Sequence, residues 1–154
     1  MTGRQGFWIV LVLSASALIA ETNTARKHWR ASRILRVVET VSMEASQRGG
    51  LPRRFGEHHL RLLSEAGELA PALVDVPVAR GWQYILLGRP QGAIRAFEEA
   101  LELEPRARVW ANLGEAHMSA GNHAEAREAF TRAIELDPLL ARELESQLAR
   151  LGEP

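Results

Sequence analysis

Two stretches of the chain decide its fold: residues 81–105, GWQYILLGRPQGAIRAFEEALELEP, and residues 114–138, GEAHMSAGNHAEAREAFTRAIELDP. The second stretch repeats the first at a fixed offset of 33 residues. A period of this length is typical of solenoids, in which each repeat is one supersecondary unit. Six recurring positions carry small residues, an aromatic residue and a closing proline: Gly81, Gly88, Ala93, Phe97, Ala100 and Pro105 recur as Gly114, Gly121, Ala126, Phe130, Ala133 and Pro138.

Each repeat has the pattern of two helices joined by a short turn. In the first repeat we expect Gly88 to end the first helix and Pro105 to end the second, because glycine accepts the left-handed cap and proline cannot continue a helix. Small residues such as Gly81 and Ala93 let the two helix axes approach, and Phe97 fills the space between them. Each pair leaves one apolar face open, so a neighbouring pair must cover it.

The second unit resembles the tetratricopeptide repeat, whose signature runs Trp-x2-Leu-Gly-x2-Tyr, then Ala-x3-Phe, then Pro. The unit departs from this signature only at His117, which stands in place of tyrosine. The matching residues are Trp110, Leu113, Gly114, Ala126, Phe130 and Pro138. The first unit has Pro77 and Arg80 in place of tryptophan and leucine, and we expect its first helix to start at or after Pro77. The resemblance implies an all-α solenoid of helix-turn-helix pairs that binds other proteins.

A third, degraded unit lies upstream, where Pro71 aligns with Pro105 at an offset of 34 residues. The segment before Pro71 is predicted to be the second helix of a divergent repeat. The first helix of that repeat is predicted to run roughly over residues 25–47, and Gly-Gly-Leu-Pro at 49–52 breaks the chain after it. Its apolar face is predicted to contain Ala31, Ile34, Leu35, Val38, Val41 and Ala45.

The chain therefore divides into four predicted parts. Residues 1–24 form a membrane anchor or signal segment, and residues 25–71 form the amphipathic helix with the divergent repeat. Residues 72–138 form the two clear repeats, and residues 139–154 form a C-terminal capping helix. The cap is predicted from one leucine stripe: Leu140, Leu144, Leu148 and Leu151.

Residues 7–20 form an uncharged run of fourteen residues that follows Arg4. As a helix this run spans about 21 Å, short of the roughly 30 Å of a bilayer core. Two interpretations stay open, an uncleaved anchor helped by local thinning of the bilayer and a signal peptide cleaved near Ala15-Ser16-Ala17. The predicted membrane contacts are Phe7, Trp8, Ile9, Val10, Leu11, Val12, Leu13, Leu18 and Ile19.

Charge is balanced over the whole chain but unevenly distributed along it. Residues 21–56 carry eight basic and three acidic side chains, and residues 57–154 carry ten basic and sixteen acidic ones. Anionic lipid would attract the basic part, so we expect a lipid contact there rather than nucleic acid. The charge-bias rule places the repeats in the cytoplasm, whereas a signal anchor places them outside. We prefer a single-pass protein with extracytoplasmic repeats, and an exported protein is the alternative.

The sequence contains no motif that is typical of a catalytic site. Without cysteine there is no disulfide, no thiolate metal site and no cysteine nucleophile. No phosphate-binding glycine loop or nucleophile elbow is present. The five histidines are expected to pack or to face solvent, with a pigment or haem ligand at His28 as a remote alternative. We therefore predict no enzyme, no cofactor and no metal site.

By analogy with the family, the inner face of the solenoid comes from the first helix of each pair. In the first repeat this face is expected to present an apolar patch of Val78, Trp82 and Ile85. An exposed apolar patch centred on a tryptophan is usually covered, in this case by the chain's own N-terminal helices or by a helix or extended peptide of a partner. The prediction is a membrane-anchored adaptor or scaffold, an accessory subunit of a membrane-associated complex, with a self-assembling oligomer or filament as the alternative. The predicted protein-binding residues are Val78, Trp82, Ile85, Arg108, Asn112, Glu115 and Met118.

Overall fold

The computed structural model describes the backbone of residues 3–47 and 52–152, and the side chains of residues 20–44 and 52–152. Within these ranges it contains helices and no strand, so the prediction of an all-α fold is confirmed. The described α-helices are α1 (Gly3–Gln47), α2 (Arg53–Leu69), α3 (Asp75–Leu86), α4 (Pro90–Leu103), α5 (Ala107–Ala120), α6 (His123–Leu136) and α7 (Ala141–Arg150). A short 3-10 helix, Pro138–Leu140, precedes α7.

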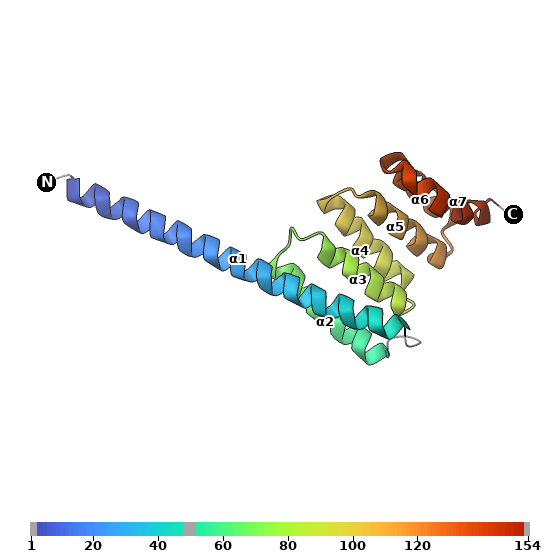
Figure 1. The fold of residues 1–154 in the computed structure, drawn as a ribbon, viewed down its shortest axis with the longest axis horizontal. Helices are drawn as coiled ribbons and strands as arrows, with labels where there is room; N and C mark the ends of the chain where they lie inside the picture. The colour runs from blue at the N-terminus through green and yellow to red at the C-terminus, as the bar shows by residue number, and fades with distance from the viewer. Residues whose placement is uncertain (1–2, 48–51, 153–154) are drawn as a thin grey trace.

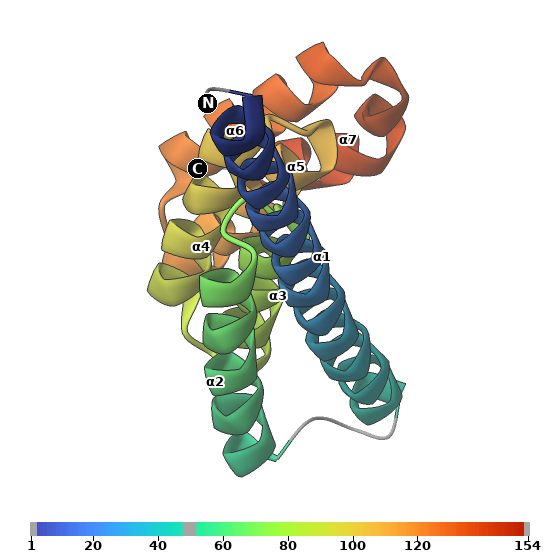
Figure 2. The same ribbon diagram turned by 90° about the vertical axis from the view of Figure 1, so that its left-hand side faces the viewer.

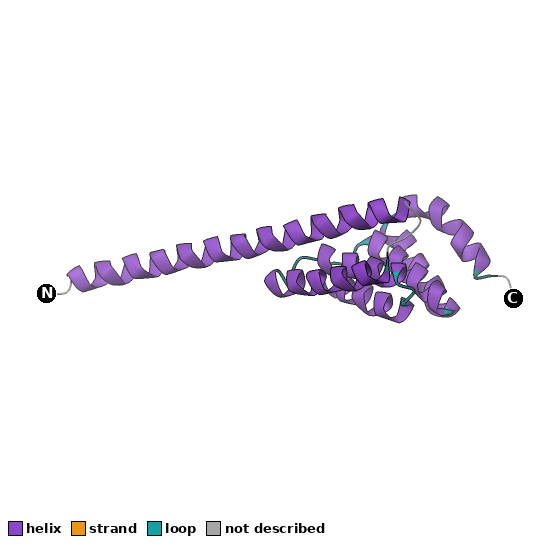
Figure 3. Ribbon diagram, turned by 90° about the horizontal axis from the view of Figure 1, so that it is seen from below, coloured by secondary structure: helices purple, strands orange, loops and turns teal. Residues whose placement is uncertain are grey.

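The helices stack in chain order, each against the next (Figure 1). Helix α1 is much longer than the others, and it is continuous through residue 24, the end of the predicted N-terminal part. Its C-terminal half lies beside α2 and α3, while its N-terminal half extends away from the repeats (Figures 1 and 3). Seen from the N-terminal end in Figure 2, α1 and α2 form the first helix pair of the solenoid.

The close contact inside each clear repeat joins a glycine of the first helix to a phenylalanine of the second. Gly81 lies against the ring of Phe97, and Gly114 lies against the ring of Phe130. A Cβ atom on Gly114 would stand 2.5 Å from Cε1 of Phe130, well inside contact distance. Both rings are completely buried. The helix axes can therefore approach this closely only where the side chain is absent.

The turn glycines have the backbone conformation that the repeat pattern predicts. Gly88 has a φ of 67° and Gly121 a φ of 79°, in the region that disfavours residues with a Cβ. Gly121 is the left-handed cap of α5. The second helices end at Leu103 and Leu136, in each case two residues before the closing proline. Local sequence therefore sets the helix lengths in both repeats.

One predicted boundary was wrong. Helix α3 starts at Asp75, two residues before the predicted start at Pro77. Pro77 is the third residue of the helix and is buried. The amide groups of the first turn have no partner inside a helix, so a proline without an N–H is accepted there.

The predicted divergent repeat is present, formed by the C-terminal half of α1 and by α2. Leu63 takes the place that Phe97 has in the next repeat and is completely buried, in one cluster with Leu35 and Val38. Ala31 belongs to a neighbouring cluster that reaches α3. The predicted apolar face of α1 is therefore buried at these positions. Val41 differs, since 39% of it is exposed, and Ala45 lies outside the described side chains.

A polar contact also holds α1 to α2 and α3. Gln83 Nε2 of α3 donates to Ser42 Oγ of α1 at 2.6 Å, and Ser42 Oγ lies 3.4 Å from His59 Nδ1 of α2. His59 and Gln83 are both buried. Burial lowers the pKa of His59; the neighbouring His58 adds to this effect, and Gln83 opposes it.

The C-terminal helix caps the solenoid as predicted. Leu140, Leu144 and Leu151 are buried in one cluster with Phe130 of the second repeat, and Leu148 packs against the same cluster. The cap therefore covers the apolar face that the last helix pair would otherwise expose.

The predicted membrane segment is only partly described. Its predicted contacts, from Phe7 to Leu13 with Leu18 and Ile19, belong to the part of α1 whose side chains lie outside the described residues. Among the residues that are described, no helix combines the length and the apolar character needed to cross a bilayer.

Adding a methyl group at Gly114 is expected to destabilise the protein by about 1–3 kcal/mol, because it forces Phe130 out of its place. Gly67→Ala in α2 is the matched control. A Cβ atom there would meet only Val76 Cγ1, at 3.7 Å, so this variant is expected to gain about 0.5–1 kcal/mol from helix propensity. Urea denaturation of both variants measures the difference, and equal effects of the two substitutions would contradict the role of the glycine contact.

Protonation of His59 is expected to destabilise the fold. The folded state lowers the pKa of His59, so the unfolded chain binds the proton more readily, and stability falls as the pH drops through the unfolded pKa. Between about pH 7.5 and about pH 5 the wild type should lose more unfolding free energy than His59→Gln. His58→Gln, which changes a less buried neighbour and removes only a smaller cause of the lowered His59 pKa, should keep most of this loss. Parallel stability curves for all three proteins would refute the assignment.

Candidate functional site

The residues predicted to bind a partner lie on the first helices of the two clear repeats. Helix α3 carries three of them and helix α5 carries four. They differ in how much surface they present.

Trp82 is the main apolar side chain that this set presents to solvent. It is 39% exposed, and its ring packs edge-to-face on Phe97, with the ring centroids 6.2 Å apart and an interplanar angle of 80°. Leu86, one turn further along α3, is 40% exposed. Phe97 therefore holds the indole in place from one side and leaves the other side accessible.

The N-terminal helices pack on α3 and leave this tryptophan partly exposed. Helix α1 reaches α3 at Gln83, which is buried and donates to Ser42. α1 also contacts α3 at Ala79, which clusters with Leu35 and Val38 of α1. The sequence left two candidates to cover the patch around Trp82, the chain's own N-terminal helices and a partner segment. With the N-terminal helices in place, 39% of Trp82 remains exposed.

Four of the predicted residues are at least partly buried and contribute to the packing of the interior. Val78 and Ile85 are half-buried and pack against the cluster that contains Phe97. Met118 packs in the same way against the cluster of the second repeat. Asn112 is only 7% exposed, so it offers little surface to a partner.

The charged members lie next to the capping helix. Arg108 Nη1 of α5 donates to both carboxylate oxygens of Glu143 of α7, at 2.7 and 2.9 Å. Glu115 is half-buried; burial, and to a lesser extent Glu143, raise its pKa, and Arg108 opposes them. The carboxylate of Glu115 is therefore poorly compensated, so a cationic or hydrogen-bonding group brought by a partner would stabilise its charged form.

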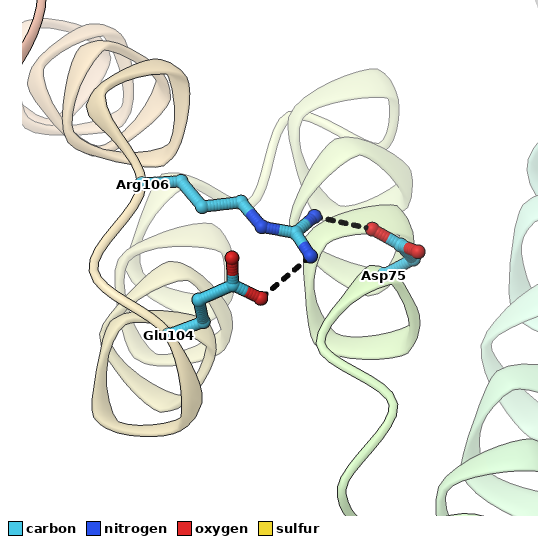
Figure 4. Close-up of polar contacts among 3 residues, drawn as sticks. All are labelled: Asp75, Glu104 and Arg106. Carbon is cyan, nitrogen blue, oxygen red and sulfur yellow. Dashed lines mark hydrogen bonds and ion pairs between the residues drawn. The ribbon is translucent and has the colours of Figure 1, made fainter.

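An arginine that the sequence did not single out ties the two helices of this face together. Arg106 precedes α5 and donates to Asp75 of α3 at 2.8 Å and to Glu104 at 2.7 Å (Figure 4). The hydrogen bond with Glu104 is the largest cause of the raised pKa of Arg106, and the same bond lowers the pKa of Glu104. Asp75 lies 31 residues away in the chain, so no local pattern could reveal this link.

Histidine and carboxylate side chains do not gather in a metal-binding arrangement in the part of the chain whose side chains are described. His59 is buried beside Ser42, and His117 Nδ1 lies 3.3 Å from the side-chain nitrogen Nδ2 of Asn122. His28 belongs to the exposed surface of α1.

Comparison with known proteins agrees with this architecture. Residues 78–141 match the family model of the tetratricopeptide repeat. Human Superkiller complex protein 3 is 37% identical over 60 residues, which cover 38% of this chain and 4% of that protein. The chain thus spans only a small fraction of that relative.

Two solved structures share the fold. A thermophilic TPR protein from Thermus thermophilus superposes with a TM-score of 0.68 at 24% identity, covering 85% of this chain and 68% of that one. A structure described as MamA MSR-1 C2 gives 0.55 at 27% identity, covering 68% and 57%. The fold and the repeats define a helical-repeat protein of the adaptor and scaffold class. The chain is a tetratricopeptide-repeat protein, with two clear repeats and a divergent one.

Proposed function

We propose that this protein is an adaptor that docks a helix or an extended segment of a partner protein on the face formed by α3 and α5. The observation that carries the proposal is the accessible indole of Trp82, which remains 39% exposed although α1 is packed next to it. Tryptophan is among the residues that most often dominate the energy of a protein interface. A tryptophan that is rigid and only half covered loses little conformational freedom on binding.

The chemistry of the face indicates the kind of partner segment that fits it. Trp82 and Leu86 offer an apolar contact on α3, whereas Arg108 and Glu115 offer charge on α5. A segment with one apolar anchor followed by a polar or basic side chain would match both parts. Val78, Ile85, Asn112 and Met118 complete the proposed contact set by shaping the surface beneath the segment.

Trp82→Ala is expected to weaken partner binding by about 2 kcal/mol or more, roughly thirtyfold in Kd, because it removes the apolar anchor. Trp29→Ala is the matched control, since Trp29 is an exposed tryptophan of α1 outside this face. Partners are captured with the full chain, and the affinity of each is then measured by calorimetry. If Trp82→Ala keeps full affinity while its unfolding free energy is intact, or if both variants lose affinity equally, this face is not the docking site.

We further propose that residues 7–20 tether the repeats to a membrane, with the repeats on the extracytoplasmic side, as an accessory subunit of a membrane-associated complex. The support for this is the uncharged run of fourteen residues and the basic stretch after it. Export after cleavage is the competing interpretation. If the segment is retained, the repeats would act at some distance from residues 7–20, because α1 continues well past residue 20 (Figure 1).

Intact-mass measurement combined with membrane fractionation of the native protein tests the tether. An uncleaved chain that pellets with membranes and resists extraction by salt is the expected result. A shortened chain in the wash would favour export instead. Light scattering of the same preparation measures the oligomeric state and so tests the alternative of self-assembly. A monodisperse monomer would count against that alternative.

A further inference from the structure

A second surface lies on the other helices of the repeats. A cavity of about 530 Å³ opens between α2 and α4, bounded by the end of α3 and the turn after it. None of the residues proposed to hold a partner on α3 and α5 lines it. We call it the α2–α4 groove.

Small side chains create the groove. Ser64 faces it from α2, and Gly92 and Ala96 face it from α4. A Cβ atom on Gly92 would stand 2.7 Å from the ring of Tyr84, so the ring lies directly on this glycine and forms part of the wall. The hollow is thus built into the repeat and does not depend on a surface loop.

The lining of the groove is unusually basic for this part of the chain. Four arginines line it, Arg61, Arg80, Arg89 and Arg95, and they are four of the ten basic residues in 57–154. Only two of the sixteen acidic residues in that range line it. A net positive groove therefore lies in a solenoid that is otherwise acidic.

Two of the four arginines are neutralised inside the groove. Arg80 forms an ion pair with Glu99, and Arg89 Nη2 lies 2.6 Å from a carboxylate oxygen of Glu57. These pairs join α3 to α4 and the α3–α4 turn to α2. Both acidic residues of the lining are used in this way, so they leave no carboxylate for the other arginines.

Arg61 and Arg95 carry the excess charge. In the part of the chain that the structure describes, neither has a carboxylate within ion-pair distance. The contact of Arg61 is a nitrogen of His58 at 3.4 Å, at the long limit for a hydrogen bond. Both side chains are exposed, one on each helix that borders the groove. Two guanidinium groups that no described carboxylate neutralises thus face one hollow from opposite walls.

We propose that the α2–α4 groove binds a short acidic segment of a protein through Arg61 and Arg95. Guanidinium groups recognise carboxylates with paired hydrogen bonds, and the groove already holds its own glutamates through arginine. The positive region is short: an adjoining cavity that shares Ser64, Arg80 and Glu99 is lined by the acidic Glu68. A few carboxylates fit this pattern, whereas a long polyanion such as a nucleic acid would meet repulsion next to the groove.

Binding in the α2–α4 groove is independent of the adaptor face on α3 and α5. The probe is a fluorescein-labelled heptapeptide with four glutamates, and fluorescence anisotropy with the full chain is measured at about 50 mM and about 200 mM salt. The double variant Arg61→Gln/Arg95→Gln should raise Kd by about tenfold or more. Arg132→Gln/Arg150→Gln removes two exposed arginines elsewhere and should change Kd less than about twofold.

Trp82→Ala should leave binding of the peptide unchanged, which separates the two surfaces. Arginine Nε–Hε resonances of the wild type provide a second measurement that does not require a variant, and those of Arg61 and Arg95 should shift on addition of the peptide. Equal loss in both double variants, no binding of the peptide, or no shift of these resonances would overturn the proposal. Tighter binding of a single-stranded oligothymidine than of the peptide would assign the groove to nucleic acid instead.

Discussion

The contact between a buried phenylalanine and a glycine on the facing helix is the constraint on which the whole structure depends. Because Gly81 and Gly114 have no side chain, Phe97 and Phe130 can lie directly on the helix backbone. The two helices of each clear repeat then pack at one close distance, and their remaining apolar residues face the neighbouring helix pairs along the solenoid. Stacking follows, since each pair can bury that face only against the next pair. The leucine stripe of α7 ends the stack, because it covers the apolar face of the last helix pair.

The same contact shapes the candidate binding face. Phe97 fills the space under α3 and also contacts the indole of Trp82, so the ring that orders the core supports the exposed indole. Arg106 adds a second restraint, because it joins the start of α3 to the turn before α5. The face is therefore carried by rigid helices and not by loops. Preformed surfaces of this kind bind with a small entropy loss.

Two surfaces with different chemistry result from the stacking of neighbouring repeats. The first helices, α3 and α5, present an apolar anchor with charges beside it. The second helices, α2 and α4, border a groove in which two arginines have no carboxylate partner among the described residues. A protein with both surfaces could hold two segments at once without competition between them, as a scaffold must. The long α1 would keep both surfaces at a distance from its N-terminal end (Figure 3).

The repeat, the turns and the cap could be predicted from the sequence, because each depends on residues within one helix pair: the period of the apolar positions, Gly88 and Gly121 at the turns, and the leucines after Pro138. The predicted binding set followed from the family pattern, which marks a face of a helix but does not say how deeply a side chain is buried. Only the tertiary structure distinguished the exposed Trp82 from the buried Asn112. It also brought together Arg106 with Asp75, and the arginines of the α2–α4 groove. These groups come from different helices, and their distances depend on how the pairs stack, which no local pattern in the chain records.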